Sequence, residues 1–364
     1  MIVHQILSGA GPRDAITMEA VAFRERFRGW GWGGRDVAAR IAPGVGARFA
    51  SLASLNAAPS DLLLLHHSAS TPGLGELLAR PNRKLLLYHN VTPALWLWDD
   101  APVVAAHCAL GREQLPELVR ASHVAAADSA FNAAELIALG ARRTEVIPLL
   151  IDLERLGPAQ SAPSVSPVPG AGPAPAPGAG RGPTVLFVGR LSPHKRQDRL
   201  IEAFAAYRGA RAPGARLVLV GEPLTEAYAE SLRRLASRLA PGAVTVESGL
   251  TSAELGERYR AADVFVCLSE HEGFCIPLLE AMHFGVPVIA RAAGAVPEVA
   301  GDAALLVPDD DPALVAELIH LAVTDAELRE ELAQRGRVRL EHYGPERVAE
   351  QLRAAVLAAG NGGL

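Results

Sequence analysis

Two glutamates and the residues around them form the pattern with the greatest chemical potential in this sequence. Glu272 and Glu280 lie in the segment HEGFCIPLLEAM, which directly follows the strand-like run DVFVCL. Gly273 lets the backbone approach a ligand closely, and Pro277 suits the first turn of a helix expected over 276–284. The N-terminus of such a helix carries a partial positive charge that attracts anions. Taken alone, the two glutamates fit solvated surface residues better, but the whole segment favours a ligand site.

Two cations follow another strand-like run, in the segment FVGRLSPHK. Arg190 and Lys195 would both emerge at the carboxyl end of the strand predicted over 184–189. Two cations beside a helix N-terminus suit a diphosphate. The alternative is a pair of solvated surface charges. Their place at the same sheet edge as the glutamate segment favours the diphosphate.

The elements that must position these residues form an alternating pattern of strands and helices. Short apolar, β-branched runs predict strands in the second half, at 184–189, 216–221, 244–247, 263–268 and 286–290. Helical patterns separate them, for example at 197–208 and 225–239. The first half repeats the pattern less cleanly, with strands at 3–7, 62–66, 84–89, 123–126 and 145–148 and a helix at 16–28. Apolar strands separated by helices predict parallel sheets covered on both faces, which bind ligands at the carboxyl ends of their strands.

One segment separates the two halves. Of the 27 residues from 157 to 183, 23 are Pro, Gly, Ala or Ser, so the segment cannot bury enough apolar surface to fold. We therefore expect an N-terminal domain over 1–156, a flexible linker over 157–183 and a C-terminal domain over 184–344. A last helix is expected from Pro345 to about residue 358, joined to the first domain.

Composition excludes several classes of protein. The net charge of -5 and the pI near 6.1 argue against nucleic-acid binding, which needs a basic field. No apolar run approaches the roughly 20 residues of a membrane span, and the start of the chain lacks the features of a signal peptide. Cys108, Cys267 and Cys275 are widely spaced and predict neither a disulfide framework nor a zinc site. These features predict a soluble cytoplasmic protein.

Three ordered segments carry a resemblance to a known family. VGRLSPHK, RAADVFVCLSEHEGFCIPLLEAMHFGVPVIA and GAVPEVAGDAALLVPDDDP resemble the nucleotide-sugar-binding domain of glycosyltransferase family 4. The resemblance covers roughly residues 184–343. It implies the GT-B fold, in which two Rossmann-like parallel-sheet domains face a central cleft. It also implies sugar transfer with retention of anomeric configuration.

The resemblance assigns roles to the residues of the second half. The E-x7-E pair of the family falls on Glu272 and Glu280, which implies contacts to the donor sugar and to the ribose of the nucleotide. Arg190 and Lys195 match the basic pair that holds the diphosphate. The other implied donor contacts use the backbone: Leu250 near the base, and Gly273, Phe274, Cys275 and Ile276 along the sugar and phosphates.

The first half matches one branch of the family. YHNVTP at 88–93 resembles its YHN[IV]TP signature, which implies that His89 is a catalytic residue contacting the donor sugar. A satisfied residue at a strand end is the alternative for this histidine. GAGPRDAI at 9–16 resembles the glycine loop of the family, with Gly11 as a donor contact. The loop departs from the usual arrangement, which leaves open the N–H groups that reach the phosphate.

The same loop supports a competing hypothesis. GAGPRD resembles the GxGxxG fingerprint of nicotinamide dehydrogenases, but Asp14 replaces the third glycine. No clean strand ending in an acid follows about 20 residues later, as that fingerprint requires. The sequence therefore disfavours a dehydrogenase.

Three other patterns receive plainer interpretations. Asp309, Asp310 and Asp311 precede Pro312 and predict a helix start, not a metal site. His66 and His67 are neighbours on a strand and point to opposite faces, so they are not a metal-ligand pair. The four tryptophans predict ordinary packing, with an acceptor platform or a peripheral membrane contact as the alternatives; they are Trp30, Trp32, Trp96 and Trp98.

These observations predict a metal-independent hexosyltransferase without a cofactor, as in polysaccharide biosynthesis. Its donor is a nucleoside-diphosphate sugar bound by the second domain, and its acceptor is a saccharide, a lipid-linked saccharide or a small molecule. Arg190, Lys195 and the helix near Ile276 would stabilise the leaving diphosphate. The inner face of the membrane is an alternative location. A non-catalytic, nucleotide-sugar-binding partner subunit is the alternative function.

Overall fold

The computed structural model describes residues 1–12, 14–159 and 182–360. It divides the chain into two compact units. Unit 1 comprises Met1–Ile151 and Tyr343–Leu364, and unit 2 comprises Asp152–His342. Most of the segment expected to be a linker, residues 160–181, lies outside the described residues.

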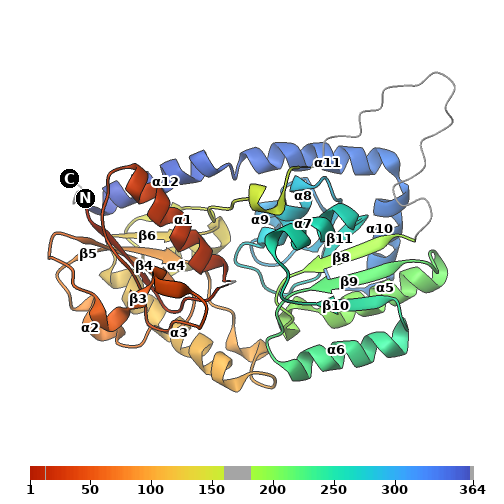
Figure 1. The fold of residues 1–364 in the computed structure, drawn as a ribbon, viewed down its shortest axis with the longest axis horizontal. Coiled ribbons are helices and arrows are strands. Elements are labelled where there is room, and N and C mark those ends of the chain that lie inside the picture. The colour runs from red at the N-terminus through yellow and green to blue at the C-terminus, as the bar shows by residue number, and fades with distance from the viewer. Residues whose placement is uncertain (13, 160–181, 361–364) are drawn as a thin grey trace. The chain divides into compact units, whose positions relative to one another are not determined.

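Unit 1 contains a seven-stranded sheet in the order β3-β2-β1-β4-β5-β6-β7, in which each strand runs parallel to its neighbours. The strands are β1 (Val3–Leu7), β2 (Asp36–Ala38), β3 (Ala50–Ser51), β4 (Leu62–His67), β5 (Arg83–Tyr88), β6 (Val124–Ala127) and β7 (Thr144–Val146). All six residues of β4 are buried. A strand buried on both faces needs helices on both sides of the sheet, as Figure 1 shows.

The helices of unit 1 come from both ends of the chain. They are α1 (Ala15–Gly29), α2 (Leu74–Leu78), α3 (Pro102–Ala121), α4 (Ala130–Ala138) and α12 (Pro345–Gly360), with 3-10 turns η1 (Gly46–Arg48), η2 (Leu52–Ser54) and η3 (Ala94–Trp96). Val348, Leu352 and Val356 of α12 recur at four-residue spacing and share a core with Leu85 and Leu87 of β5. Burial of this apolar stripe attaches the C-terminal helix to the first sheet.

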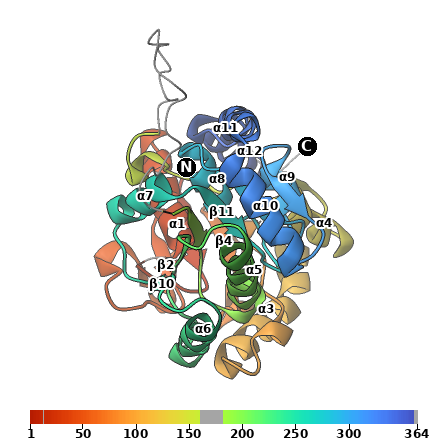
Figure 2. The ribbon, with the colours of Figure 1, turned by 90° about the vertical axis from the view of Figure 1, so that its right-hand side faces the viewer.

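Unit 2 repeats the architecture with six parallel strands in the order β10-β9-β8-β11-β12-β13. The strands are β8 (Thr184–Val188), β9 (Arg216–Val220), β10 (Val244–Glu247), β11 (Val264–Cys267), β12 (Val288–Arg291) and β13 (Leu305–Val307). The helices are α5 (Gln197–Ala210), α6 (Glu226–Leu239), α7 (Ser252–Ala261), α8 (Ile276–His283), α9 (Val296–Ala300), α10 (Pro312–Thr324) and α11 (Ala326–Glu341), with 3-10 turns η4 (Glu154–Leu156) and η5 (Pro193–Lys195). Helices α5 and α10 lie side by side (Figure 2), and Phe204 and Ile319 join them in one core.

The predicted strands and helices are present. The sequence analysis missed the short strands β2, β3 and β13 and named no helix at α3, α4, α7 or α11. These strands span two or three residues, too few to show a period. Strand β2 pairs with β1 and begins at Asp36, whose carboxylate lies 2.7 Å from the Arg24 guanidinium. An acid therefore does follow the glycine loop, but it is engaged in an ion pair.

Candidate active site

An ion pair forms the centre of the site in unit 2. Lys195 Nζ in η5 lies 2.6 Å from Oε1 of Glu272, in the loop between β11 and α8. Burial works to raise the pKa of Glu272, but the charge and the hydrogen bond of Lys195 lower it overall. The structure therefore brings together the residue predicted to contact the donor sugar, Glu272, and a residue predicted to contact the diphosphate, Lys195. Both lie at the carboxyl ends of two adjacent strands.

A close backbone contact holds the Glu272 loop in place. The Ala295 N–H donates to the Glu272 carbonyl at 2.9 Å. A Cβ at Gly294 would lie 2.3 Å from the same carbonyl oxygen, and the φ of +59° disfavours other residues. Sequence reasoning missed this role, although Gly294 opens the third of the family-like segments.

Helix α8 begins without a side-chain cap. Cys275 occupies the N-cap position at a φ of +79°, and its side chain makes no capping hydrogen bond. The backbone N–H groups of the first turn therefore have no side-chain acceptor at the cap. This arrangement fits the predicted backbone contacts of Gly273, Phe274, Cys275 and Ile276 with a negatively charged ligand.

Glu280 is buried, and both of its carboxylate oxygens accept hydrogen bonds. Oε1 accepts from Arg155 Nη2 at 2.5 Å, and Oε2 accepts from the Tyr259 hydroxyl at 2.8 Å. Burial raises the pKa of this carboxyl, which the charge of Arg155 opposes. The sequence analysis did not identify either partner, because both lie far from Glu280 along the chain.

The remaining predicted donor residues of unit 2 lie at the same edge of the sheet. Arg190 follows β8 after one residue, Gly189, and is exposed, while its carbonyl accepts from Gln197 Nε2. Leu250 follows β10 and is half-buried, next to Gly249, whose N–H donates to Glu222 Oε1 at 3.0 Å. An exposed guanidinium at this edge is available to an anionic ligand.

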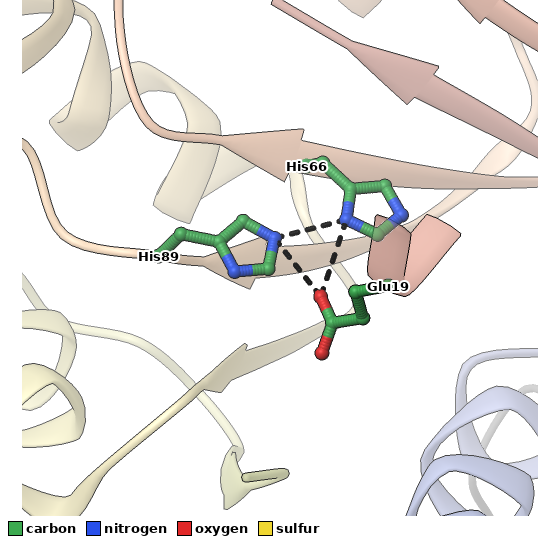
Figure 3. A group of neighbouring side chains, drawn as sticks. All are labelled: Glu19, His66 and His89. Carbon is green, nitrogen blue, oxygen red and sulfur yellow. Dashed lines mark hydrogen bonds and ion pairs between the residues drawn. The ribbon is translucent and has the colours of Figure 1, made fainter. Parts of the chain in front are cut away.

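In unit 1, the ring of His89 is buried within a polar network (Figure 3). His89 Nε2 lies 2.9 Å from His66 Nδ1, and His89 Nδ1 lies 2.9 Å from Asp128 Oδ1. Glu19 Oε2 lies 3.6 Å from His89 Nε2 and 4.0 Å from His66 Nδ1. The side chain of His89 is 1% exposed, and both of its ring nitrogens have protein partners.

The network holds two groups with displaced pKa values. Burial raises the pKa of Glu19 to about 8, which the charge of His89 opposes. Burial works to lower the pKa of His89, but Asp128 and Glu19 raise it overall to about 9. At neutral pH, Glu19 is therefore protonated and His89 is a cation.

These values predict that the free energy of unfolding falls as the pH rises. Unfolded Glu19 ionises near pH 4.5, whereas the folded chain keeps this proton to about pH 8. The raised pKa of His89 also adds to the free energy of unfolding. This added stability is fully present below the ordinary pKa of 6.5 and is lost as the pH rises to about 9. Glu19→Gln is expected to remove the share of this pH dependence that is due to Glu19, because glutamine cannot ionise. At pH 8.5 the variant should therefore have a free energy of unfolding a few kcal/mol higher than the wild type, since one pKa unit corresponds to about 1.4 kcal/mol.

Urea unfolding at pH 5.5, 7 and 8.5 measures this effect. Glu25→Gln, an exposed change on the same helix, is the matched control and should follow the wild-type pH dependence. Equal pH dependence in Glu19→Gln and wild type would show that Glu19 is ionised in the folded chain.

The glycine loop before α1 uses its own polar groups. The Gly11 N–H donates to Thr17 Oγ1 at 3.0 Å. The Asp14 carboxylate caps α1 by accepting from the Thr17 N–H at 2.8 Å. An acidic cap repels a phosphate from this helix N-terminus. In the described part of this loop, the Gly11 N–H and the Thr17 N–H are therefore already bonded, unlike the N–H groups of a dinucleotide fingerprint.

Two clusters have the residue types of a metal site. Their ligand-type atoms lie within 4.8 Å of one another; the clusters are Glu19, His66 and His89, and Cys267, Glu272 and Cys275. In the second cluster Glu272 already binds the Lys195 ammonium, whose charge disfavours a metal cation.

The sequence predicted structural roles for the three aspartates before α10 and for the tryptophans. Asp311 caps α10 by accepting from the Ala313 N–H, as the predicted helix start requires, and Asp310 lies 2.9 Å from Arg196. The rings of Trp30 and Trp32 pack on Phe27, as predicted, whereas Trp98 is 48% exposed and does not fit the prediction of ordinary packing. None of the helices in the described residues is both long and apolar enough to cross a membrane.

Comparisons with known proteins agree with this geometry. Residues 176–339 match the family model described as glycosyl transferases group 1. A D-inositol 3-phosphate glycosyltransferase of Acidothermus cellulolyticus is 32% identical over 339 residues, which cover 81% of this chain and 72% of the relative. The chain belongs to the group 1 glycosyltransferases.

This group 1 glycosyltransferase is also similar to a second named enzyme and to a solved structure. A GDP-mannose-dependent alpha-mannosyltransferase of Mycobacterium tuberculosis is 42% identical over 113 residues, 31% of this chain and 26% of the relative. The structure of a sucrose-phosphate synthase from Thermosynechococcus elongatus matches with a TM-score of 0.72 at 19% identity, covering 97% of this chain and 98% of that one. The structural likeness establishes the two-domain GT-B fold.

Proposed function

We propose that this glycosyltransferase is a retaining, metal-independent hexosyltransferase. Its donor is a nucleoside-diphosphate sugar, and its acceptor is a saccharide, a lipid-linked saccharide or a small molecule, as in polysaccharide biosynthesis. The observation that carries the proposal is the Lys195–Glu272 pair beside the uncapped start of α8. It joins a cation, an anionic acceptor and a helix N-terminus without a side-chain cap at one sheet edge.

Each group in unit 2 has a chemical task in this proposal. As the glycosidic bond to the diphosphate breaks, negative charge develops on the leaving group, and Arg190, Lys195 and the first turn of α8 stabilise it. Glu272 accepts hydrogen bonds from the donor sugar, and Glu280 accepts from the ribose. With two cations and a helix N-terminus facing that charge, the proposed reaction requires no metal and no cofactor.

The residues of unit 1 make the remaining donor contacts in the proposal. The residue His89 is 9% exposed while its side chain is only 1% exposed, so the accessible part is its main chain. We assign the sugar contact to the His89 carbonyl and a further donor contact to Gly11, whose N–H would exchange the Thr17 hydroxyl for the ligand. The proposed reaction takes place in the cytoplasm, at the inner membrane face where the acceptor is lipid-linked.

A panel of nucleotide sugars tests the proposal. Thermal unfolding is measured with UDP-, GDP- and ADP-sugars at saturating concentration, with NAD as the control. A ligand at 100 times its dissociation constant adds about 2.7 kcal/mol to the free energy of unfolding, which raises the midpoint by several degrees. A shift with one nucleotide sugar supports the proposal, and a shift with NAD alone contradicts it.

Lys195→Met is expected to weaken nucleotide binding. The ammonium is the cation that we place on the diphosphate, and a charge-assisted hydrogen bond contributes about 1.5–3 kcal/mol, or roughly 10- to 100-fold in affinity. Isothermal titration of UDP and GDP measures the change. Arg199→Met, which removes a surface cation paired with Glu202, is the control. Unaltered affinity in Lys195→Met would exclude the diphosphate role.

A further inference from the structure

A row of four polar side chains crosses the carboxyl edge of the sheet in unit 1. Gln5 comes from β1, His66 from β4, and His89 and Asp128 follow β5 and β6 directly, so the row spans four adjacent strands. His66 Nε2 lies 3.0 Å from Gln5 Oε1, and the two other links of the row are the His66–His89 and His89–Asp128 contacts described above. The row is buried and continuous.

The first end of the row is fixed by a buried ion pair. Gln5 Nε2 donates to the Ala20 carbonyl and to Asp36 Oδ1, both at 2.8 Å. Asp36 is also bound by Arg24, so its oxygens accept. The amide of Gln5 therefore has one orientation, in which Oε1 faces His66. Because Oε1 can only accept, His66 Nε2 must carry a proton.

The other end of the row fixes a second proton. His89 Nδ1 lies 2.9 Å from Asp128 Oδ1 and 3.1 Å from Asp128 Oδ2, and it donates its proton to Oδ2. Between the two rings, the contact of His66 Nδ1 with His89 Nε2 needs one more proton. Four ring nitrogens thus hold three protons, whereas two neutral imidazoles hold two. With Asp128 ionised, as its contact with a cationic His89 favours, the pair carries one positive charge.

The geometry of the pair differs from that of a metal site. The ring planes differ by 4° and the ring centroids lie 5.2 Å apart, as expected of two rings sharing one straight hydrogen bond. The inner nitrogens therefore face each other. Two nitrogens on one tetrahedral zinc, each about 2.0–2.1 Å from it, would lie about 3.4 Å apart and point at a common centre. A shared proton explains the cluster better than a metal ion.

We propose that Gln5, His66 and Asp128 are positioning residues that hold His89 as an imidazolium and so fix the main chain that follows it. Asn90 is the next residue, at a φ of +65°, and its side chain donates to Asn132 Oδ1 at 2.7 Å. A non-glycine residue keeps such a conformation only when its surroundings hold it there. The link to sugar transfer rests on the proposed function, which places the donor on the His89 carbonyl.

The charged groups around the pair favour this state. The charges of Asp128 and of Asp14, the N-cap of α1, raise the pKa of His89, and Glu19 adds its charge only above about pH 8, where it ionises. The raised pKa of His89 and the lowered pKa of His66, which is due to burial and to His89, agree with a proton held on the His89 side.

Nitrogen NMR of the full-length 15N-labelled chain tests the charge without any assay of transfer. Exposed histidines lose their charge near pH 6.5, so an imidazolium that persists at pH 8 reports this pair. We expect such a signal in the wild type and its loss in His66→Phe. His67→Phe is the matched control, because His67 is the equally buried neighbour on β4 and bonds to the Gly111 carbonyl instead. Two neutral rings at pH 8, or a shift of both rings to zinc-bound signals on adding Zn²⁺, would overturn the proposal.

Kinetics then test the positioning role. In His66→Phe we expect kcat/KM for transfer to fall by about 100-fold, the cost of misplacing a contact by about 1 Å. The basic limb of the pH profile of kcat/KM should also lie at lower pH in His66→Phe than in the wild type. His66→Asn, whose amide oxygen can accept from His89, should recover a part of the rate, and His67→Phe should leave the rate and the limb unchanged.

The two proposals fail separately. An imidazolium in a chain that binds no nucleotide sugar would contradict the proposed function alone. Unchanged kcat/KM and pH profile in an active His66→Phe would contradict the positioning role alone.

Discussion

Glu272→Gln is expected to lower kcat for sugar transfer by about 10³-fold or more while the chain stays folded. The substitution keeps the shape of the side chain but removes the charge that pairs with Lys195 at 2.6 Å. The buried ammonium then loses its partner, and the donor sugar loses an anionic acceptor. Losing a group that acts on the reacting sugar affects the transition state, so kcat should fall more than the affinity for the nucleotide.

Glu270→Gln is the matched control for this prediction. Glu270 lies two residues away in the same loop, but its carboxylate pairs with Arg196 at 2.8 Å and Arg291 at 3.4 Å instead of Lys195. Its replacement should change kcat by less than about tenfold, the factor that corresponds to 1.4 kcal/mol. Turnover with the preferred nucleotide sugar measures both variants, and circular dichroism checks that they fold. Wild-type turnover in Glu272→Gln would remove Glu272 from the active site.

Arg24→Met is expected to lower the free energy of unfolding by about 3–5 kcal/mol, the usual result of breaking a buried ion pair from one side. The guanidinium donates to both oxygens of Asp36 and to the Val3 carbonyl at 2.8 Å. Methionine fills much of the volume but leaves the Asp36 carboxylate without its cation. Because Asp36 orients Gln5, the change should also disturb the His66–His89 pair.

Arg26→Met separates this effect from the loss of a surface cation. Arg26 lies on the same helix and pairs with Glu346, but the side chain of Glu346 is 80% exposed. Exposed pairs contribute at most about 1 kcal/mol, so this variant should unfold close to the wild type. Urea unfolding of the two variants measures the difference, and equal stabilities would contradict the structural role of the Arg24–Asp36 pair.

The sequence was most informative where the site is continuous along the chain. A strand, a short loop and a helix with Pro277 near its start follow one another from residue 263 to residue 284, so their order places Glu272 at the carboxyl edge of the sheet. Lys195 follows β8 in the same way. The spacing of apolar residues predicts the strands, and the parallel topology then brings their ends together. This reasoning needs no knowledge of side-chain partners.

Partners that lie far apart along the chain could not be predicted in this way. Glu280 bonds to Arg155, 125 residues earlier, and to Tyr259 on a different helix. Neither residue type nor spacing marks these contacts, because they arise from the packing of helices against each other. The sequence therefore identified Glu280 as a candidate ligand but not the hydrogen bonds that hold its carboxylate.

The sequence by itself determined two parallel-sheet domains and a ligand edge with its glutamate loop and its cations. Only the tertiary structure showed that the ring of His89 is buried and charged, with its main chain as the accessible part. That state depends on Gln5, His66 and Asp128, three residues that lie far apart along the chain. Local spacing fixes which strand a residue follows, whereas the protonation of a buried ring depends on every donor and acceptor that packing brings to it.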